Sequence, residues 1–296
     1  MHRISRDKVI YTMSGKNEAV LRVEPGERIL FETEDALHGQ IKAGGQGFEG
    51  LDWGRVNPAT GPVYINGAQP GDVLTVRIEE ILVESTGVVA CGEGMGSLGH
   101  LLKGNTAKVM QIEGEMAHFS EDLSLPLNKM VGVIGTAPAK GEIPCGAPDF
   151  HGGNMDCKEI KEGATVLLPV NVPGALLAIG DLHAVMADGE AGVTGLEVAG
   201  SVKVTVGIIK NRVLPLPMVV NDSYVMTLAS DEDLDIAVDM AASNMAEYLT
   251  KVECHTMNDA AMLISLVADV RICQVVDPKK TIRVEFPRKY LKVNLI

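Results

Sequence analysis

The sequence predicts a mainly β protein with α-helical additions near its C-terminal end. Short stretches rich in β-branched residues recur between turn residues, among them KVIYTM, ERILFET, ATVLLPV, SVKVTVGII and TIRVEF. The chain contains 32 glycines and 14 prolines, which supply turns between such stretches. A helical period is concentrated in the segment that begins at Ser230. Sheets are therefore expected over most of the chain, and helices late in it.

The segment GAQPGDVLTVRIEEI, residues 67–81, shows the strand pattern in detail. Its Pro-Gly pair favours a tight turn before the strand begins. After the turn, Thr75 and Arg77 alternate with Val76 and Ile78, so polar and apolar side chains fall on opposite faces. This alternation is typical of an antiparallel sheet with one face on the core and the other towards solvent.

Two helices are expected after the strands. Ser230 is the expected N-cap of the first, and the acidic residues after it suit the positive end of the helix dipole. Apolar residues recur at helical spacing through LDIAVDMAASNMAEYL. The second helix is expected to begin near Asn258 or Asp259 and to run through AAMLISLVADV. We expect the pair to form an αα-hairpin that covers a sheet.

Composition and charge narrow the kinds of partner. With 296 residues and 46% hydrophobic content, the chain can bury a large core and should fold without disulfides or structural metals as supports. Its net charge of -13 opposes general electrostatic binding to nucleic acid or to an anionic membrane, and we expect neither as a partner. A small neutral or cationic ligand fits better. The sequence shows neither a secretion signal nor an apolar run of bilayer length, so a cytoplasmic location is expected.

The five cysteines are odd in number and form no Cys-x-x-Cys pair. This pattern argues against a disulfide framework and against a structural zinc knuckle, and it favours reduced thiols. Cys145 and Cys157 are candidate nucleophiles, yet neither lies beside a histidine in an obvious catalytic register. Buried, inert thiols are commoner.

Four ionisable residues interrupt apolar sequence in GDLHAVMADGE, namely Asp181, His183, Asp188 and Glu190. An unpaired buried charge is costly, so such groups need another charge, hydrogen bonds or a metal ion as partners. On a strand, Asp181 and His183 point to the same side, and so do Asp188 and Glu190 after the turn. The segment therefore predicts several ligating or proton-carrying groups over one small patch. The plainer interpretation of its Asp-x-His is a hydrogen-bonded surface pair.

Two further segments carry residues of the same types. Asp35 and His38 follow the apolar strand RILF, and CGAPDFHGGNMDCKEI places His151, Asn154 and Asp156 around two glycines. Carboxylates and imidazoles gathered at strand ends are ligands for Zn²⁺ or a related divalent ion that keeps one position open for water. Asn154 beside glycines is also an ordinary turn former, and His38 could be a solvated loop residue.

Three motifs, taken in order, resemble the acetamidase/formamidase family. They are Gly-Gly-Asn-Met-Asp at 152–156, Gly-Asp-x-His-Ala at 180–184 and Asp-Gly-Glu at 188–190. NPATGPVYINGAQPGDVLTVRIEEI near the front and ISLVADVRICQVVDP near the end extend the resemblance over nearly the whole chain. One departure is Met186, where many relatives carry Gln; if that position lines the pocket, Met186 makes the pocket more apolar.

The resemblance implies hydrolysis of a small aliphatic amide, such as formamide or acetamide, to the carboxylic acid and ammonia. It also implies a CUB-like β-sandwich core with added elements, and assembly as a homo-oligomer. We expect residues 1–225 to form the β-rich catalytic core. Residues 226–296 would then be a helical hairpin and final strands packed on that core, unless the two parts form one continuous domain.

Within that resemblance the residues acquire roles. A divalent metal, expected to be zinc, would activate a water and polarise the substrate carbonyl. Glu190 would carry a proton from the water to the departing nitrogen, with Asp188 as a second catalytic acid. The expected metal ligands are Asp35, Asp181, His183 and Asp156, and the expected substrate-binding residues are Gly152, Gly153, Asn154 and His151.

Two alternatives stay open from the sequence. The same carboxylates could hold Ca²⁺ as a structural ion, either as an additional ion in the enzyme or in a β-sandwich binding protein. His183 discriminates, because imidazole suits Zn²⁺ and not Ca²⁺. The other alternative keeps amide hydrolysis and makes Cys145 or Cys157 the nucleophile.

Overall fold

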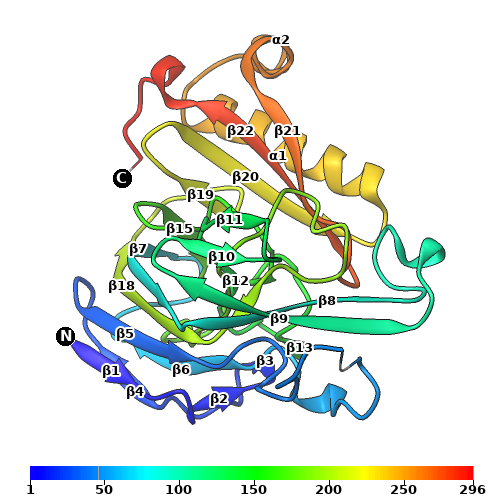
Figure 1. Ribbon diagram of the computed structural model, residues 1–296. Helices are drawn as coiled ribbons and strands as arrows, with labels where there is room; N and C mark the ends of the chain where they lie inside the picture. Colours follow the sequence, from blue (N-terminus) through cyan, green and yellow to red (C-terminus); the bar gives the residue numbers. More distant parts are fainter. Residues whose placement is uncertain (46, 296) are drawn as a thin grey trace.

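The computed structural model describes residues 1–45 and 47–295 of the chain. Two large, mostly antiparallel sheets pack face to face, and two helices cover part of one of them (Figure 1). The predicted mainly β class, with a sandwich core and late helices, is confirmed. Short 3-10 helices lie at Trp53–Arg55, Gly99–Leu101 and Arg288–Tyr290.

The first sheet has nine strands and includes both early and late parts of the chain. The expected boundary at residue 225 falls within its strand β20, so the same sheet continues across that point. In order of pairing its strands are β1 (His2–Ile4), β5 (Arg28–Thr33), β18 (Gly200–Ile209), β7 (Val73–Val83), β15 (Thr165–Pro169), β19 (Met218–Val220), β20 (Tyr224–Asp231), β22 (Lys280–Pro287) and β21 (Asp269–Gln274).

The second sheet has eleven strands and carries the motif segments. Its main path is β11 (Ser124–Pro126), β10 (Met116–His118), β9 (Asn105–Glu113), β8 (Thr86–Gly92), β17 (Glu197–Val198), β16 (Leu177–His183), β12 (Met130–Gly135) and β14 (Gly152–Asn154). Strand β6 (Ala59–Ile65) pairs with β16, and β2 (Val9–Ile10) and β4 (Leu21–Val23) pair with β6. A separate pair is formed by β3 (Thr12–Ser14) and β13 (Glu142–Pro144).

The core between the sheets follows from strand alternation. Leu74, Val76 and Ile78 of β7 are fully buried and join the main apolar cluster, which also receives side chains from β12, β16 and β18. Thr75 is half-buried and Arg77 is exposed on the other face of the same strand. The polar and apolar faces predicted for this strand are therefore confirmed.

Helix α1 (Leu234–Lys251) packs on β20 and β22, and α2 (Met257–Val267) packs mainly on α1 (Figure 1). The first helix is capped by Asp233, whose carboxylate accepts from the N–H groups of residues 235 and 236. The predicted N-cap, Ser230, is wrong because β20 continues through that residue. Thr256 caps α2, close to the predicted start.

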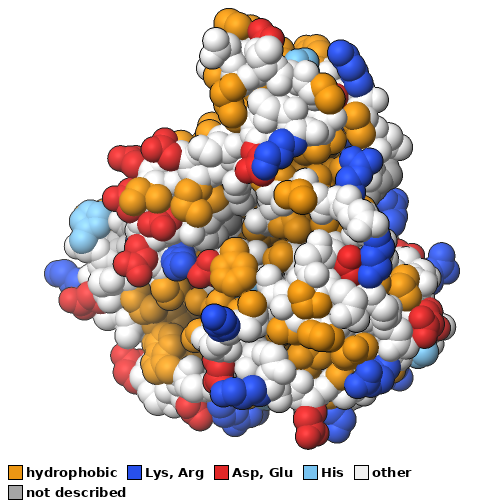
Figure 2. Space-filling model, turned by 180° about the vertical axis from the view of Figure 1, so that it is seen from behind, with side chains coloured by type: hydrophobic (Ala, Val, Ile, Leu, Met, Phe, Trp, Pro, Cys, Tyr) orange, Lys and Arg blue, Asp and Glu red, His pale blue; other side chains and the backbone are white. Residues whose placement is uncertain are grey.

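Charged and apolar side chains are interspersed on the surface. Figure 2, which shows the face opposite to that in Figure 1, has acidic and basic side chains around several apolar patches. Within the described residues, neither helix has both the length and the apolar character needed to cross a membrane.

Candidate active site

A cavity of about 590 Å³ lies where the motif segments of the second sheet meet the loops at its edge. Its lining combines two kinds of side chain. Acidic and imidazole groups come from Asp156, Asp181, His183, Glu190, Glu197 and Asp277, which we call the acid cluster. The rest of the lining is largely apolar and comes mostly from loops.

Strand pairing brings the acid cluster together. Asp181 and His183 end β16, and His183 lies opposite Glu197 of β17 in the ladder. On the other side of β16, strand β12 separates it from β14, and Asp156 lies two residues after the end of β14. Glu190 belongs to the loop that joins β16 to β17. The sheet order therefore explains why acids from distant parts of the sequence face one point.

The imidazole of His183 is the centre of this arrangement. Its Nε2 lies 3.2 Å from Asp181 Oδ1, 3.2 Å from Glu197 Oε2 and 3.8 Å from Asp156 Oδ1. All of these side chains are at most 3% exposed. Nδ1 lies on the other side of the ring, 3.2 Å from Met186 Sδ. The ring therefore directs Nε2 at the carboxylates.

Three members of the acid cluster adopt left-handed backbone conformations that are uncommon for residues other than glycine. The φ angles are +41° at Asp156, +55° at Asp181 and +45° at Glu190. Such conformations cost on the order of 1 kcal/mol or more each and gather at functional sites. Their coincidence here indicates that the fold imposes the position of these carboxylates.

Two glycines allow the backbone to approach the cluster closely. A Cβ on Gly132 of β12 would lie 2.5 Å from Asp156 Oδ1 and 2.7 Å from Asp181 Oδ2. A Cβ on Gly195 would lie 2.7 Å from His183 Nδ1. Any side chain at either position would therefore displace a cluster group.

Burial and crowding shift the protonation of the cluster. Burial raises the pKa of Glu190 to about 8. Burial, with the charges of neighbouring acids added, also raises the pKa values of Asp156, Glu197 and Asp277 well above the usual range. Burial would lower the pKa of His183, but the Glu197 and Asp181 carboxylates outweigh it and raise that pKa. The cavity therefore contains more carboxyl groups than its one imidazolium can keep ionised.

These residues fit a divalent metal. Asp156 Oδ1 and Glu190 Oε2 are buried without a hydrogen-bond partner among the described residues, and Glu197 Oε2 is buried against His183 Nε2 at 3.2 Å. The ligand atoms of Asp156, His183 and Glu190 lie within 4.8 Å of one another, as do those of Asp181, His183 and Glu197. A donor set of one imidazole nitrogen and several carboxylate oxygens is typical of zinc and related ions.

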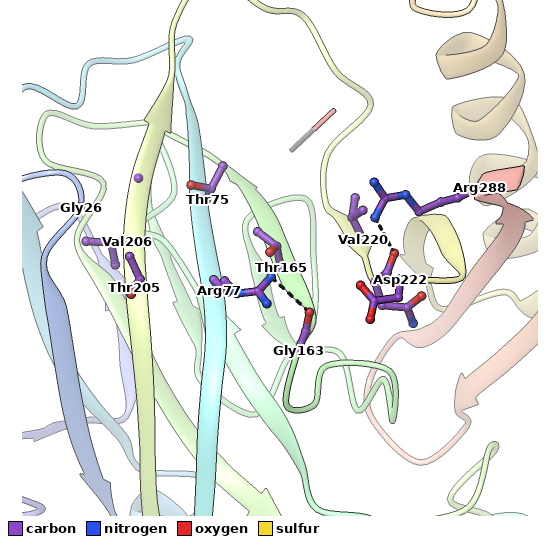
Figure 3. A pocket seen from close by; sticks show the side chains of 12 residues that line it. Gly26, Thr75, Arg77, Gly163, Thr165, Thr205, Val206, Val220, Asp222 and Arg288 are labelled. Atoms are coloured by element: carbon purple, nitrogen blue, oxygen red, sulfur yellow. Dashed lines mark hydrogen bonds between the residues drawn. The ribbon is translucent and has the colours of Figure 1, made fainter. Parts of the chain in front are cut away.

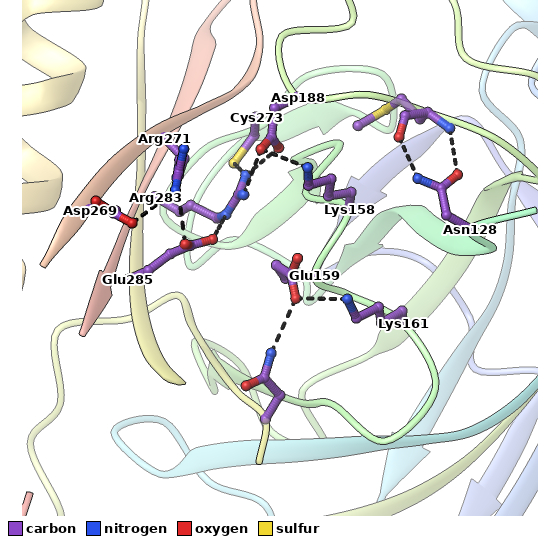
Figure 4. Close-up of polar contacts among 12 residues, drawn as sticks. Asn128, Lys158, Glu159, Lys161, Asp188, Asp269, Arg271, Cys273, Arg283 and Glu285 are labelled. Carbon is purple, nitrogen blue, oxygen red and sulfur yellow. Dashed lines mark hydrogen bonds and ion pairs between the residues drawn. The ribbon is translucent and has the colours of Figure 1, made fainter. Parts of the chain in front are cut away.

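Asp188 does not share this patch, which corrects the expectation that it and Glu190 face the same point. Both of its oxygens accept from Arg283, at 2.6 and 2.9 Å, and Lys158 Nζ lies 2.9 Å from Oδ2 (Figure 4). These partners lower the pKa of Asp188 against the effect of burial. The φ angles are +96° at Gly189 and +45° at Glu190, so the alternation of an extended strand does not hold there and the two carboxylates have different partners.

The same loop is docked on the late strands of the chain. Gly189 forms a parallel bridge with Gln274, at the end of β21. Its N–H donates to the carbonyl of Cys273 at 2.9 Å, and its own carbonyl accepts from Val275 at 3.2 Å. Arg283, on β22, is 1% exposed. The loop that carries Glu190 is therefore positioned by residues far along the sequence.

Asp35 also lies apart from the acid cluster. Its carboxylate accepts from the backbone N–H groups of Leu37 and Gly39, at distances from 2.8 to 3.2 Å. It belongs to neither group of possible ligands found among the described residues. Asp35 therefore orders the start of the loop after β5. The sequence alone does not distinguish this structural role from metal binding.

The Gly-Gly pair allows close packing, and His151 is buried beside it. Within the described part of the chain, Gly152, Gly153 and His151 are buried but do not line the cavity, whereas Asn154 does. A Cβ at Gly152 would lie 2.3 Å from the Ile134 carbonyl oxygen, and one at Gly153 would lie 2.3 Å from the Ala147 oxygen. The glycines let β14 approach its neighbours, so the expected contact of their backbone with substrate does not match this geometry.

Sequence reasoning missed Glu197 and Asp277. Glu197 is the single acid between Leu196 and Val198 in an apolar strand, which is the signal that could have identified it. Asp277 follows β21 and precedes Pro278, and its sequence resembles an ordinary turn. Only the packing of the late strands against the second sheet brings it to the cavity.

Neither candidate nucleophilic cysteine reaches the cavity. Cys145 and Cys157 are fully buried and are absent from the described lining. Burial raises the pKa of Cys145 to about 12, so its thiol stays protonated. Met186 is likewise buried behind His183 and does not belong to the described lining. A change from Gln to Met there would reach the cavity through the imidazole.

A second hollow, of about 480 Å³, lies on the outer face of the nine-stranded sheet (Figure 3). Arg77 and Arg288 line it, and their guanidinium groups donate to backbone carbonyls at 3.5 and 2.9 Å. Its described lining contains one carboxylate, Asp222, and no imidazole. The donor set of the acid cluster is not reproduced there.

Comparison with known proteins agrees with this fold. The profile of the acetamidase/formamidase family matches residues 16–144 and 143–290. The solved structure of acetamidase from Bacillus halodurans is 43% identical, with a TM-score of 0.97 over 98% of this chain and 100% of that chain. The acetamidase structure from Yersinia enterocolitica is 32% identical, with a TM-score of 0.92 over 99% and 93%.

More distant relatives extend the comparison. The formamidase of Methylophilus methylotrophus is 26% identical over 311 residues, which cover 78% of this chain and 76% of that protein. The chain spans 63% of the length of a relative from Schizosaccharomyces pombe. From the profile and the solved structures together, the chain belongs to the acetamidase/formamidase family.

Proposed function

We propose that this protein hydrolyses a linear amide to the carboxylate and ammonia, the reaction that the names of its relatives describe. The observation that carries the proposal is the acid cluster, in which buried carboxylates surround the Nε2 atom of His183 beside a substantial cavity. Such a concentration of buried ionisable groups is costly to the fold and is typical of a functional site.

We propose that Asp181, His183 and Glu197, with Asp156 beside them, would hold a divalent cation, zinc being the expected ion. When bound, such a cation lowers the pKa of a water and polarises a carbonyl oxygen. His183 belongs to both groups of possible ligands, and an imidazole ligand favours zinc over calcium, which binds oxygen ligands. A calcium ion in addition stays a prediction from the sequence.

Glu190 is the proposed proton carrier. The Gly195 N–H donates to its Oε1 at 2.8 Å and fixes the carboxyl group, while Oε2 has no described partner. Its pKa of about 8 belongs to the site without a cation, and a bound cation would lower it. The ionised carboxylate would then accept a proton from an attacking water and return it to the departing nitrogen. Both transfers use the free oxygen.

Asn154 is the proposed substrate-binding residue among those expected. It lines the cavity and is 3% exposed, and its Oδ1 has no described hydrogen-bond partner. That oxygen can accept from the amide N–H₂ of a substrate. Asp188 would act at a distance, by holding the loop of Glu190 through Arg283, and would take no part in proton transfer.

The test is ammonia release from formamide and acetamide before and after chelation, with metal content measured in parallel. We expect activity to disappear with the bound metal and to return when Zn²⁺ is added. Alkylation by N-ethylmaleimide should leave activity intact, because both candidate thiols are buried away from the cavity. Full activity in protein shown to be free of metal would contradict the proposal. The homo-oligomeric assembly and the cytoplasmic location stay predictions.

A further inference from the structure

We infer that the cavity accepts primary amides whose acyl group is apolar and clearly larger than that of formamide or acetamide. This inference rests on the amide hydrolysis proposed above and names its substrate class. The cavity volume of about 590 Å³ lies within the range of roughly 300–1,000 Å³ that suits ligands of drug size. A one- or two-carbon amide beside the acid cluster would leave most of this space to water.

Apart from the acid cluster, the cavity has an apolar part of its lining, which we call the apolar wall. It is formed by Leu37, Phe48, Trp53, Met95 and Val193. Leu37 and Phe48 are 4% and 6% exposed and belong to a separate small apolar core. Met95 and Val193 pack against that same core. The wall is therefore held in place by its own packing before any ligand arrives.

Trp53 is the part of the wall that remains open to solvent. Its side chain is 56% exposed, although its ring lies against Phe48 with centroids 5.8 Å apart. Asp52 caps the short helix that begins at Trp53, and Arg55 Nη2 lies 3.1 Å from His38 Nε2. A large apolar ring fixed at the edge of a cavity gains most when an apolar ligand covers it.

The wall and the acid cluster line the same cavity, so one substrate molecule can use both. The amide group would occupy the cluster, and the acyl chain would extend along the wall. Each methylene buried there should raise kcat/KM about fourfold, which corresponds to about 0.8 kcal/mol per CH₂. The rise should continue until the acyl group fills the wall.

Two measurements on the intact protein test the inference. Trp53 is the single tryptophan of the chain, so its fluorescence reports directly on the wall. Titration with phenylacetamide should shift its emission to shorter wavelength, and acetamide at the same concentration should not. In the metal-loaded enzyme, kcat/KM should rise through acetamide, butyramide and hexanamide, and should be high for phenylacetamide.

Trp53→Ala should lower kcat/KM for phenylacetamide tenfold or more and change that for acetamide less than twofold. Tyr290→Ala is the matched control, because Tyr290 is also an exposed aromatic residue (50%) and is not part of the described lining. If acetamide is turned over well, but larger amides are poorer substrates and leave the fluorescence unchanged, the inference is overturned and the proposed function stands. If phenylacetamide shifts the emission but no amide is hydrolysed, the wall binds apolar ligands and the proposed function, with the substrate class drawn from it, fails.

Discussion

Replacing Asp188 by Asn should weaken both the fold and the active site. The substitution keeps the shape of the side chain but removes the charge that faces Arg283, whose side chain is 1% exposed. Breaking a buried ion pair costs about 3–5 kcal/mol. Asp188 is 26% exposed and Glu285 still pairs with Arg283 Nε at 2.7 Å, so we expect a loss of about 2–3 kcal/mol.

For a chain of this size, that loss corresponds to a fall in Tm of roughly 4–10 °C. Thermal unfolding followed by circular dichroism measures it, and ammonia release should fall as well because Glu190 shares the loop. Glu247→Gln is the control: its partner Lys251, 2.6 Å away, is 58% exposed, and such pairs contribute at most about 0.5 kcal/mol. Equal Tm values for Asp188→Asn and Glu247→Gln would refute the view that the ion pair with Arg283 holds the loop of Asp188 and Glu190 in place.

The other predictions concern the acid cluster and the thiols. Glu190→Gln should lower kcat by about 10²–10⁴-fold with the circular dichroism spectrum unchanged; a rate within threefold of wild type would exclude it as proton carrier. In metal-free protein, the pKa of Glu190 is about 8 in the folded state, compared with an ordinary value of 4.5. The folded state therefore binds more protons than the unfolded state between these values. The free energy of unfolding should fall by up to about 4 kcal/mol as the pH rises from 5 to 9. Denaturant titrations at several pH values measure this, and the slope should flatten in Glu190→Gln. Gly132→Ala should weaken zinc binding more than tenfold in calorimetry because its methyl group meets two cluster carboxylates, whereas Gly192→Ala, with open space around it, should not. Cys145→Ala should keep kcat within threefold, and loss of activity without unfolding would revive the thiol mechanism.

Local sequence pattern was sufficient for the mainly β class and the late helices, whereas the sandwich core was expected from the family resemblance. Alternation along β7 and the Pro-Gly turn before it depend on neighbouring residues, and both were predicted. The start of α1 was misplaced by a few residues, because Ser230 and Asp233 are both good N-caps and only the pairing of β20 with β22 decides between them. The order of strands within the sheets is a long-range property that a single sequence does not contain.

In the candidate site, too, some residues could be predicted from local sequence pattern and others depend on tertiary packing. The side chains of Asp181 and His183 meet, as the alternation of residues along a strand predicts, although the backbone at Asp181 is left-handed. That rule fails for Asp188 and Glu190, because Gly189 and Glu190 both have positive φ angles and the backbone is not extended there. Asp277 reaches the cavity only through the tertiary packing of late strands, and no local pattern announces it.

The docking of the loop at Gly189 on residues 273–275 has a consequence for the timing of synthesis. A ribosome that has delivered the chain as far as α2 has already released most of the cluster acids, but neither Asp277 nor Arg283. At that stage the nascent chain has most residues of the acid cluster, but it lacks Arg283 and the residues 273–275 that position the loop of Glu190. The proposed active site is therefore completed only after β21 and β22 have been synthesised and have paired with the rest of the sheet.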